Sequence, residues 1–439
     1  MNKRKMKNEK RKNCRVGLVA DGSPGKSFRH SFLMIVLIFI TMTNTACTRS
    51  SDWVQFRGEG GRGVSASRIS PPLGLKWKID LQPGSDEIIR SLNPPVVIGD
   101  TIYFGSDDGN FYALDVESGF MRWVFKSGAN INSIPYADKD QVYFGSKDGK
   151  LYALSRETGE EVWSFQTRSQ INSQVQRYGD YIVFVGDADA VYFLSPDGEQ
   201  QFIVDNPTWY NYTFLMHDDV MYFAPGQRGH LIGPYDINQK EYLWFLSLDD
   251  FEAIWYSFSA VRGDLLYFGT ADILYNGMYL GYHAFNRHTG ELVWRHYIDG
   301  ILNSHEWNYL WDLFWRYVDL LDFLAPTVWG DLVIFAGGDN TARAFDADTG
   351  VLRWEHIFDT PVSSAPTLAD GRVYFGLMGS ENTSGELIPP QLVCLSARDG
   401  KMLWQMDIEG SILSAPVIAG KRIIFGTDEN IFYVLEQVF

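Results

Sequence analysis

A repeat with a period of 40 residues constrains the fold of this chain more than any other feature. Residues 100–123 read DTIYFGSDDGNFYALDVESGFMRW, and residues 140–163 read DQVYFGSKDGKLYALSRETGEEVW with the same spacing. A fixed period of this length indicates stacked copies of one supersecondary unit, since a single copy cannot bury its hydrophobic face alone. Further copies cover residues 179–202, 219–244, 263–294, 330–354, 371–404 and 420–435.

One copy of the repeat has the pattern of a small antiparallel sheet. In the first copy, alternating segments at residues 102–105, 111–114 and 121–125 are separated by Asp108-Gly109 and Ser118-Gly119. Glycine supplies the positive φ that tight hairpin turns require. An additional strand is expected before each copy, as at residues 93–97, 364–368 and 414–417. Four antiparallel strands of this size form one blade of a β-propeller.

The two ends of the repeat array complete each other. The last copy reaches Phe439 before its tryptophan position, and Leu75–Ile79, centred on Trp77, is an outer strand without a blade of its own. Propellers seal the ring by joining such an N-terminal strand to the C-terminal blade, which leaves no long exposed edge. We therefore predict an all-β fold over residues 75–439, an eight-bladed β-propeller of four-stranded blades with one short helical insertion.

The repeat pattern YFGS-x-DG-x-LYAL-xxx-TG-xxx-W resembles the PQQ-type repeat of quinoprotein dehydrogenases and of the outer-membrane assembly propeller lipoprotein of Gram-negative bacteria. The sequence DWVQFRG at residues 52–58 also resembles the start of PQQ-repeat-like proteins, and Gly58–Gly61 is expected to be a flexible lead-in. Phe202 stands at the tryptophan position of the third copy. The resemblance implies that the blade tryptophans are structural and dock between neighbouring blades: Trp77, Trp123, Trp163, Trp244, Trp294, Trp354 and Trp404.

The first 46 residues have the composition of an export signal. They carry ten basic residues against two acidic ones, followed by the apolar run Phe32–Ile40 and by small residues up to Ala46. This order is typical of a secretory signal, and nine apolar residues are too few to span a bilayer as a helix. We predict a signal peptide at residues 1–46, an N-terminal segment at residues 47–74 and the propeller at residues 75–439.

The dipeptide Ala46-Cys47 resembles the lipobox of bacterial lipoproteins, in which the cysteine carries the lipid. Cys47 is then the lipid anchor of an exported protein, held at the outer membrane on its periplasmic or cell-surface side. Asn44 departs from the aliphatic residue that the pattern expects, so a plain signal peptide is the alternative. Cys394 is the only other cysteine after the signal, so the mature chain is expected to lack an internal disulfide.

The charge of the exported chain argues against nucleic acid as a partner. Without the signal, 28 basic and 52 acidic residues remain, which gives a net charge of −24. Phosphate binding requires clustered lysine and arginine, and no such cluster follows Cys47. A protein partner or a cation is therefore favoured.

Departures from the repeat gather in two kinds of connection that emerge on the same face of a propeller. One kind links the second and third strands of a blade, and the other links a blade's outer strand to the next inner strand. Both are expected as loops, at residues 203–214, 226–232, 247–258, 269–280, 296–323 and 377–391. Their aromatic residues are candidates for binding a partner or ligand: Trp209, Tyr210, Tyr212, Trp255, Tyr256, Trp307, Trp311 and Trp315.

Aromatic rings of this kind serve as rigid anchors in protein recognition, or as the floor of a pocket for a planar ligand. The alternative is that they pack the long loops against one another. Within the longest insertion, residues 304–321 have apolar residues at helical spacing and are expected to form a helix with Ser304 as its N-cap. Trp315 falls on the polar face of this helix, where it is expected to be an exposed anchor for a partner.

Signals for enzymatic chemistry are sparse. The chain has no HExxH, GxSxG or GxxxxGK motif, and its histidines lack metal-binding spacing, so no catalytic or metal-ligating residue is assigned. The resemblance offers a PQQ-dependent dehydrogenase as an alternative, with the quinone and calcium at the propeller's centre. The adjacent cysteines and the CxxCH segment of many such enzymes are missing.

We therefore expect no cofactor, and a non-catalytic, membrane-tethered scaffold for protein–protein interaction outside the cytoplasm. The resemblance implies outer-membrane protein assembly as its role. A quinoprotein-type oxidoreductase and a small-molecule-binding propeller are the alternatives.

Overall fold

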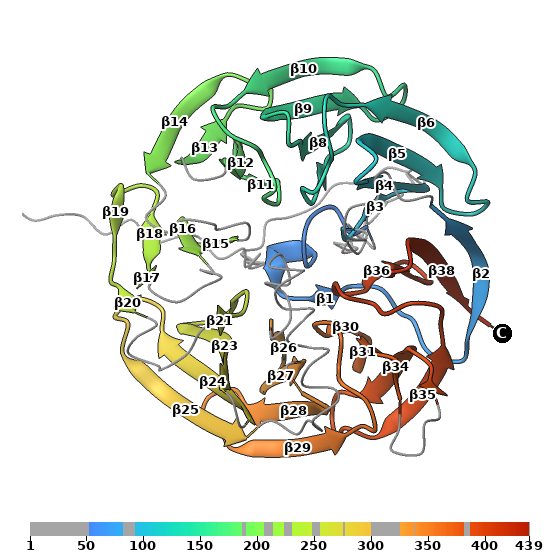
Figure 1. The fold of residues 1–439 in the computed structure, drawn as a ribbon. Coiled ribbons are helices and arrows are strands. Elements are labelled where there is room, and N and C mark those ends of the chain that lie inside the picture. Colours follow the sequence, from blue (N-terminus) through green and yellow to red (C-terminus); the bar gives the residue numbers. More distant parts are fainter. Residues whose placement is uncertain are drawn as a thin grey trace, which may run out of the picture. The chain divides into compact units, whose positions relative to one another are not determined.

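The strands of the chain pair into antiparallel blades that are arranged around a central axis (Figure 1). The computed structural model describes residues 52–81, 93–186, 190–205, 214–223, 231–247, 255–274, 277–299, 325–337, 339–381 and 387–438. These residues form eight blades of four strands each, which confirms the predicted all-β propeller. The predicted helix at residues 304–321 lies outside the described residues, within which the only helix is the 3-10 turn η1 (Glu59–Gly61).

The first four blades follow the chain order. Blade I contains β3 (Val96–Ile98), β4 (Thr101–Gly105), β5 (Asn110–Asp115) and β6 (Met121–Lys126). Blade II contains β7 (Tyr136–Ala137), β8 (Gln141–Gly145), β9 (Lys150–Ser155) and β10 (Glu161–Gln166). Blade III contains β11 (Gln176–Tyr178), β12 (Tyr181–Gly186), β13 (Ala190–Leu194) and β14 (Gln200–Asp205). Blade IV contains β15 (Phe214–His217), β16 (Val220–Phe223), β18 (Pro234–Asp236) and β19 (Glu241–Tyr242).

The second half of the ring ends with the N-terminal strand. Blade V contains β22 (Ala260–Arg262), β23 (Leu265–Leu274), β24 (Gly277–Asn286) and β25 (Leu292–Asp299). Blade VI contains β26 (Thr327–Trp329), β27 (Leu332–Ala336), β28 (Thr341–Asp346) and β29 (Leu352–Ile357). Blade VII contains β30 (Thr367–Ala369), β31 (Arg372–Leu377), β34 (Gln391–Ser396) and β35 (Met402–Asp407). Blade VIII contains β36 (Val417–Ala419), β37 (Arg422–Gly426), β38 (Ile431–Gln437) and β2 (Leu73–Asp80).

Ring closure is confirmed by the pairing of β2 with β38. The register is antiparallel from Leu73 opposite Gln437 to Asp80 opposite Ile431. The Lys76 ammonium lies 2.7 Å from a carboxylate oxygen of Glu436 on β38 and 2.7 Å from one of Glu117 in blade I. The N-terminal strand is thus bound both to its own blade and to the next one around the ring.

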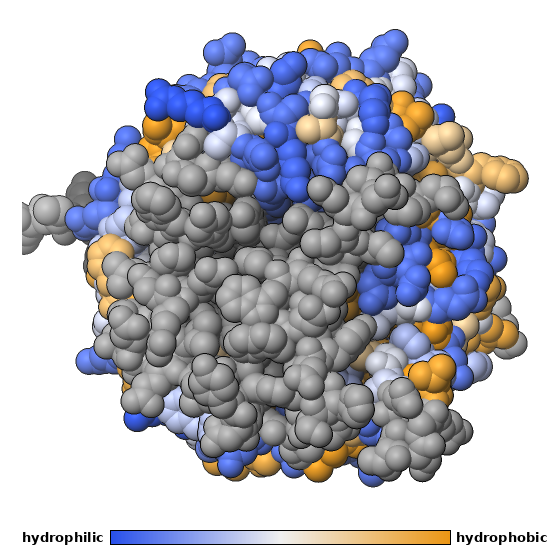
Figure 2. Space-filling view, viewed as in Figure 1, coloured by the Kyte–Doolittle hydropathy of each residue, from blue (hydrophilic) through white to orange (hydrophobic). Residues whose placement is uncertain are grey.

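Burial within a blade follows the distance from the axis. Every residue of β4 is buried, whereas residues of the outer strand β6 alternate between exposed and half-buried. Strands that are covered on both faces read as continuous hydrophobic runs, and half-covered strands alternate. The space-filling view shows hydrophobic residues at the rim of the ring (Figure 2). The outer strand β29, for example, carries exposed Leu352 and Ile357.

The two faces of the ring differ in their connections. Turns between the first and second strands and between the third and fourth strands define what we call the smooth face. Connections between the second and third strands and from the outer strand to the next blade define the decorated face. The first kind of smooth-face turn is a two-residue hairpin in blade I, where Ile98 pairs with Thr101 around Gly99, whose φ is 62°.

The blade tryptophans join each blade to the next. The indole N–H of Trp123 on β6 donates to the carbonyl of Arg156, which is the first residue of a smooth-face turn in blade II, at 2.9 Å. The same contact recurs for Trp163, Trp244, Trp294 and Trp354 with Pro196, Arg287, Ala347 and Ala397, and across the closure for Trp77 with Val116. The Trp404 side chain is half-buried and packs against the hydrophobic cluster of blade VIII.

Each indole also covers a glycine of the turn that it contacts. Gly159 has a φ of 74°, and a Cβ atom there would lie 2.6 Å from the ring of Trp123. Equivalent contacts occur at Gly119, Gly198, Gly290, Gly350 and Gly400. The repeat therefore requires glycine in this turn for two reasons, the left-handed backbone and the space taken by the indole.

The seam between blades III and IV departs from this arrangement. Phe202 on β14 replaces the tryptophan and pairs with Phe193, where blades I, II, V and VI place alanine opposite the tryptophan, as with Ala113 opposite Trp123. Lys240, at a φ of 58°, replaces the turn glycine, and its ammonium lies 5.4 Å from the centroid of the Phe202 ring. A phenyl ring is smaller than an indole and leaves space for the Lys240 side chain in the turn.

We expect the variant Gly159→Ala to measure the contribution of one tryptophan contact. Gly179 is the matched control, because it also has a positive φ but nothing within 4 Å of an added Cβ. Gly179→Ala should lower the free energy of unfolding by about 1–2 kcal/mol through backbone strain alone. Gly159→Ala should cost about 1–3 kcal/mol more through overpacking against Trp123. Urea denaturation measures both, and equal losses would contradict the account.

The seam can be converted to the regular arrangement as a second test. Phe202→Trp alone should lower the free energy of unfolding by about 1–3 kcal/mol, because the indole meets Phe193 and the Lys240 side chain. The triple variant Phe193→Ala, Phe202→Trp, Lys240→Gly should recover most of this loss, since contacting residues couple by about 0.5–3 kcal/mol. A triple variant whose stability equals the sum of the three single effects would show that the positions do not act as a unit.

Candidate functional site

The decorated face carries extra structure on blades IV, V and VII. Blade IV adds β17 (Leu231–Ile232), which pairs with β20 (Leu246–Ser247). Blade VII adds the small hairpin β32 (Ser380–Glu381) and β33 (Leu387–Ile388). Both lie within the predicted insertions, and Leu387 is 78% exposed.

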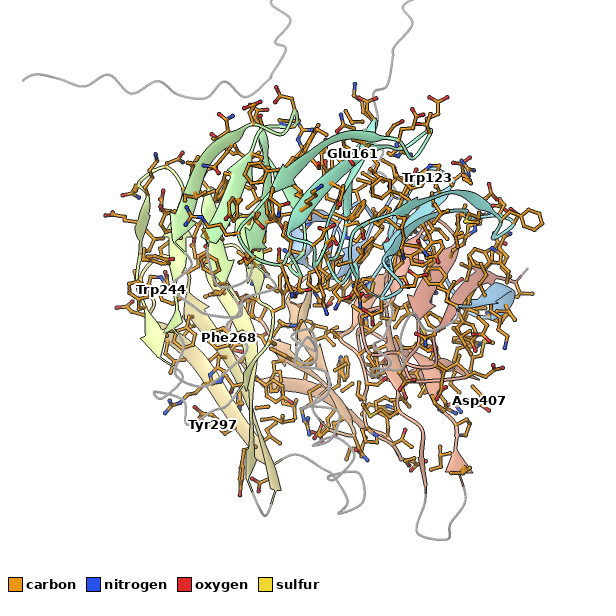
Figure 3. The ribbon with its side chains drawn as sticks, turned by 45° about the horizontal axis from the view of Figure 1, so that its top comes forward. Trp123, Glu161, Trp244, Phe268, Tyr297 and Asp407 are labelled. Atoms are coloured by element: carbon orange, nitrogen blue, oxygen red, sulfur yellow. The ribbon has the colours of Figure 1, made fainter. Side chains whose placement is uncertain are left out.

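The largest described addition is the extension of β23 and β24 in blade V (Figure 3). Residues 269–280 were expected to form a loop, and this expectation is wrong. They continue the hairpin, with the register running without interruption to Leu274 opposite Gly277. Polar and apolar residues alternate from Thr270 to Ile273, and this alternation was the sequence signal for the first of the two strands. Tyr279 and Tyr297 are exposed on this extension, with the Arg295 guanidinium 5.5 Å from the Tyr297 ring.

The candidate aromatic residues fall mainly outside the described part of the chain. Trp255 and Tyr256 form β21, which pairs with Ala271 and Thr270 of β23 and widens the blade V hairpin. These two residues therefore belong to the decorated face. The remaining candidates lie outside the described residues: Trp209, Tyr210, Tyr212, Trp307, Trp311 and Trp315, together with the predicted lipid anchor Cys47.

The centre of the ring contains the N-terminal segment, residues 52–72 (Figure 1). Trp53 exchanges two backbone hydrogen bonds with Val97 of β3, at 2.8 and 2.7 Å. The carbonyl of Val54 accepts a hydrogen bond from the backbone N–H of Ala137 of β7. The segment thus adds to the innermost strands of blades I and II, and Trp53 is only 2% exposed.

The tip of the segment packs against the blades on the other side of the axis. Phe56 joins a hydrophobic cluster with Leu215, Phe258 and Ala365, and its ring meets Phe258 edge-on at 5.1 Å. A Cβ atom on Gly61 would lie 2.6 Å from the Leu215 side chain. Gly58–Gly61 is therefore a packed turn and not the flexible lead-in that its composition suggested.

Arg57 carries a charge into the centre of the ring. It is 1% exposed, and its Nη2 donates to the carbonyl of Pro326 at 2.7 Å and to Oγ1 of Thr327 at 3.2 Å. Its own carbonyl accepts the N–H of Gly63 at 2.9 Å, which turns the chain back. Buried hydrogen bonds from a charged group are among the stronger ones in proteins, so Arg57 fixes the segment to blade VI.

The returning half of the segment runs along blades VII and VIII. The strand β1 (Val64–Ser65) pairs in parallel with Leu368 and Ala369 of β30, and Oγ of Ser65 donates to the carbonyl of Ile418 in β36. Tyr374 donates its hydroxyl to the carbonyl of Ile69. Residues 52–72 thus form a hairpin that contacts both the first and the last blades of the ring. The aromatic and arginine residues of DWVQFRG were its sequence signal.

This hairpin bears on whether the centre fits a quinone and calcium. The segment lies at the centre of the ring, where Trp53 contacts blade I and Phe56 and Arg57 contact blades IV to VI. Calcium requires six to eight oxygen ligands, and the described residues contain no group of three or more His, Cys, Asp or Glu side chains that could hold a metal ion. The described part of the centre thus offers the chain's own hairpin and no cluster of acidic side chains of the kind that calcium favours. No helix among the described residues is long and apolar enough to cross a bilayer.

Buried titratable groups outside the centre have structural partners. The guanidinium of Arg343 makes two hydrogen bonds to the Asp339 carboxylate, at 3.0 and 2.9 Å, and one to Tyr282 of blade V. This network was not anticipated from the sequence, because nothing local marks Arg343 as buried. Burial lowers the pKa of His283 to about 3, and its Nε2 lies 2.9 Å from Oγ1 of Thr270. His283 is therefore neutral at physiological pH.

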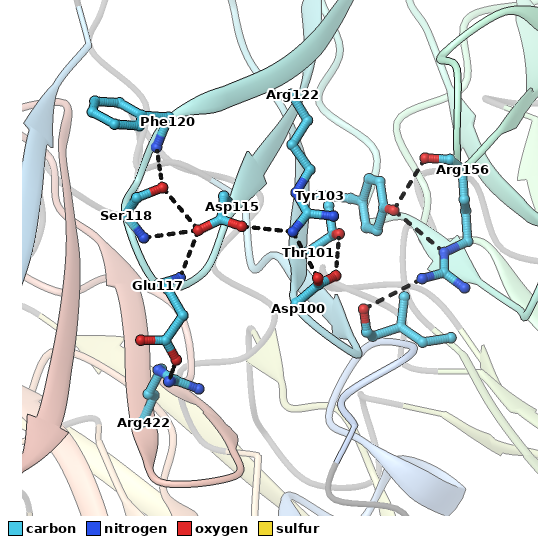
Figure 4. Close-up of polar contacts among 11 residues, drawn as sticks. Asp100, Thr101, Tyr103, Asp115, Glu117, Ser118, Phe120, Arg122, Arg156 and Arg422 are labelled. Carbon is cyan, nitrogen blue, oxygen red and sulfur yellow. Dashed lines mark hydrogen bonds and ion pairs between the residues drawn. The ribbon is translucent and has the colours of Figure 1, made fainter.

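The smooth face is acidic and is crossed by ion pairs (Figure 4). An exposed aspartate stands in the turn between the first two strands of seven blades: Asp100, Asp140, Asp180, Asp219, Asp264, Asp331 and Asp370. Arg122 bridges Asp100 and Asp115 and lowers the pKa of Asp115 to about 2. Glu117 of blade I pairs with Arg422 of blade VIII.

A sequence profile of the outer membrane protein assembly factor BamB matches residues 69–204, 122–300, 283–384 and 361–438. The chain belongs to this PQQ-like β-propeller family. Residues 52–68 of the hairpin precede the matched region. No curated protein sequence matches the chain.

Solved structures with the same fold include proteins of two kinds. BamB from Moraxella catarrhalis is 15% identical with a TM-score of 0.58, and the match covers 83% of this chain and 99% of that one. Quinohemoprotein alcohol dehydrogenase ADHIIG from Pseudomonas putida HK5 is 15% identical with a TM-score of 0.63, covering 89% and 81%. A europium-containing methanol dehydrogenase is 13% identical with a TM-score of 0.59, covering 89% and 99%. At these identities the likeness shows the fold alone.

We expect the purified protein not to bind PQQ in the presence of calcium, because the hairpin fills the axis. Equilibrium dialysis with free PQQ measures this directly. The control is the variant Trp53→Ala, Phe56→Ala, in which the hairpin loses its two aromatic contacts. Binding gained only in this variant would show that the hairpin blocks the axis. Stoichiometric binding by the unaltered protein would contradict the expectation.

Proposed function

We propose that this protein is a non-catalytic, membrane-tethered scaffold outside the cytoplasm, whose protein partners dock on the decorated face. The observation that carries the proposal is the match of the BamB profile to residues 69–438, nearly the whole propeller. Within the family, the proposed role is outer-membrane protein assembly. The export signal and Cys47 predicted from the sequence supply the tether.

The described geometry supports a binding role over a catalytic one. The axis, where a propeller offers its deepest concave site, is filled by Trp53, Phe56 and Arg57. The buried Arg343 guanidinium and Asp339 carboxylate form a bidentate ion pair, as expected of groups with a structural role. A scaffold needs a rigid frame with variable connections on it, and the repeat provides both.

The decorated face is the better docking surface of the two. Its connections vary in length between blades, and blade V extends β23, β24 and β21 beyond the regular repeat. Exposed Tyr279 and Tyr297 are of the residue type that dominates protein interfaces. The smooth face has short turns whose side chains already pair with each other, as Arg122 does with Asp100 and Asp115.

Crosslinked pull-down from native membranes tests the proposal. We expect one defined partner, an outer-membrane assembly component, whose capture falls by about tenfold or more when residues 307–315 are replaced by a short Gly-Ser turn, as for loss of hot-spot residues. The double variant Trp255→Ala, Tyr256→Ala should weaken capture in the same direction. The matched control is Arg398→Ala, an exposed residue in a smooth-face turn of blade VII, which should leave capture unchanged.

Two outcomes would overturn the proposal. If capture is lost in Arg398→Ala and kept in the decorated-face variants, the partner docks on the smooth face and not on the decorated face. A protein that remains in the soluble fraction after cell breakage would remove the membrane tether.

A further inference from the structure

We infer that the smooth face of the propeller is turned toward the membrane and that the decorated face points away from it. The inference rests on the tether in the proposed function, and adds an orientation that the tether alone does not give. It follows from where the N-terminal hairpin leaves the ring. A lipid attached through a long flexible chain would let the propeller rotate freely relative to the membrane.

The chain reaches the ring at the smooth face. A carboxylate oxygen of Asp52 accepts the backbone N–H of Gly99 at 3.1 Å, and Gly99 is in the smooth-face turn of blade I. From there the chain runs antiparallel to β3, since Trp53 is paired with Val97. Because β3 runs toward the smooth face, the described chain starts at the smooth face with Asp52 and enters the ring from there.

This exit point is fixed in position. Trp53 is held by two backbone hydrogen bonds and is almost fully buried, and Arg57 binds the far wall of the axis through Pro326 and Thr327. Shifting the exit point would require the segment to slide, which would break the buried contacts of both residues. The ring and the start of its tether therefore move as one body.

The fully extended tether is no longer than the ring is thick. Cys47 is five residues before Asp52, so the lipidated residue lies at most about 17 Å from the smooth face at ~3.4 Å per residue. Strands of five or six residues, such as β4 and β5, separate the two faces by about 20 Å. The decorated face, on the far side of the ring from the exit point, is therefore kept at a greater distance from the bilayer.

The charge of the smooth face is compatible with this orientation. The exposed aspartates of its turns surround the exit point, so anionic lipid repels the face. The Debye length is about 8 Å at physiological ionic strength, and a tether of about 17 Å lets the face stand two such lengths away. The smooth face thus faces the bilayer without touching it, and the partner on the decorated face is a water-exposed protein surface and not lipid.

Two labelled variants of one blade test the orientation. Arg398→Cys places a spin label on the smooth face of blade VII, and Leu387→Cys places one on β33 of the decorated face. Cys394 is buried and stays unlabelled. The full lipidated protein is reconstituted in vesicles whose headgroups chelate nickel, and the paramagnetic relaxation of each label is measured.

We expect relaxation at position 398 to exceed that at position 387 by at least about fivefold, given the thickness of the ring. Equal relaxation, or the reverse order, would overturn the inference while leaving the tether intact. Failure of the protein to bind the vesicles at all would instead overturn the tether of the proposed function, and the inference with it.

A variant with a longer tether tests whether the short tether is what sets the orientation of the propeller. Insertion of about 20 Gly and Ser residues before Asp52 gives a mean reach of about 25 Å and frees the ring to rotate. The difference between the two labels should then fall to less than about twofold on the same length argument. A difference that survives the insertion would mean that the smooth face itself binds lipid, and the tether would not be what sets the orientation.

Discussion

The contact between each blade tryptophan and the turn of the next blade is the interaction on which the ring depends. An indole such as that of Trp123 buries a large apolar area, and its N–H is satisfied by a backbone carbonyl of the neighbouring blade. The turn glycine, Gly159 in this example, brings the backbone close enough for both contacts to form. Because the hydrogen bond and the packing lie across a blade boundary, each copy of the repeat is completed by the copy that follows it.

The N-terminal hairpin gives the ring a second set of contacts that the repeat does not encode. It brings Trp53, Phe56 and Arg57 to the axis, where the blades alone would leave a channel. The centre of a propeller is a common place for a ligand, and in this chain the N-terminal segment lies there.

The period of the repeat was sufficient to predict the blades, their number and the closure by β2, because each copy carries its own turn glycines and its own alternation of apolar residues. The hairpin at the axis could not be predicted in this way, since it occurs once and its burial depends on blades hundreds of residues away, as the contact from Arg57 to Pro326 shows. The length of the extension at residues 269–280 breaks the period of the repeat and therefore predicts a loop. The structure instead continues the two strands of the hairpin. The aromatic candidates rested on composition alone, and of these only Trp255 and Tyr256 fall in the described part of the chain.

The contacts of the hairpin with both ends of the ring have a consequence for folding. In an open array of repeats, each unit touches only its neighbours, and an end unit can unfold while the rest remains. Here Val97 in blade I and Leu368 in blade VII pair with the same short segment, and Ile418 in blade VIII receives a hydrogen bond from it. Loss of any one of these blades also releases contacts of the others. The hairpin therefore adds to the cooperativity that ring closure by β2 already gives, and its long-range contacts are of the kind that slow folding.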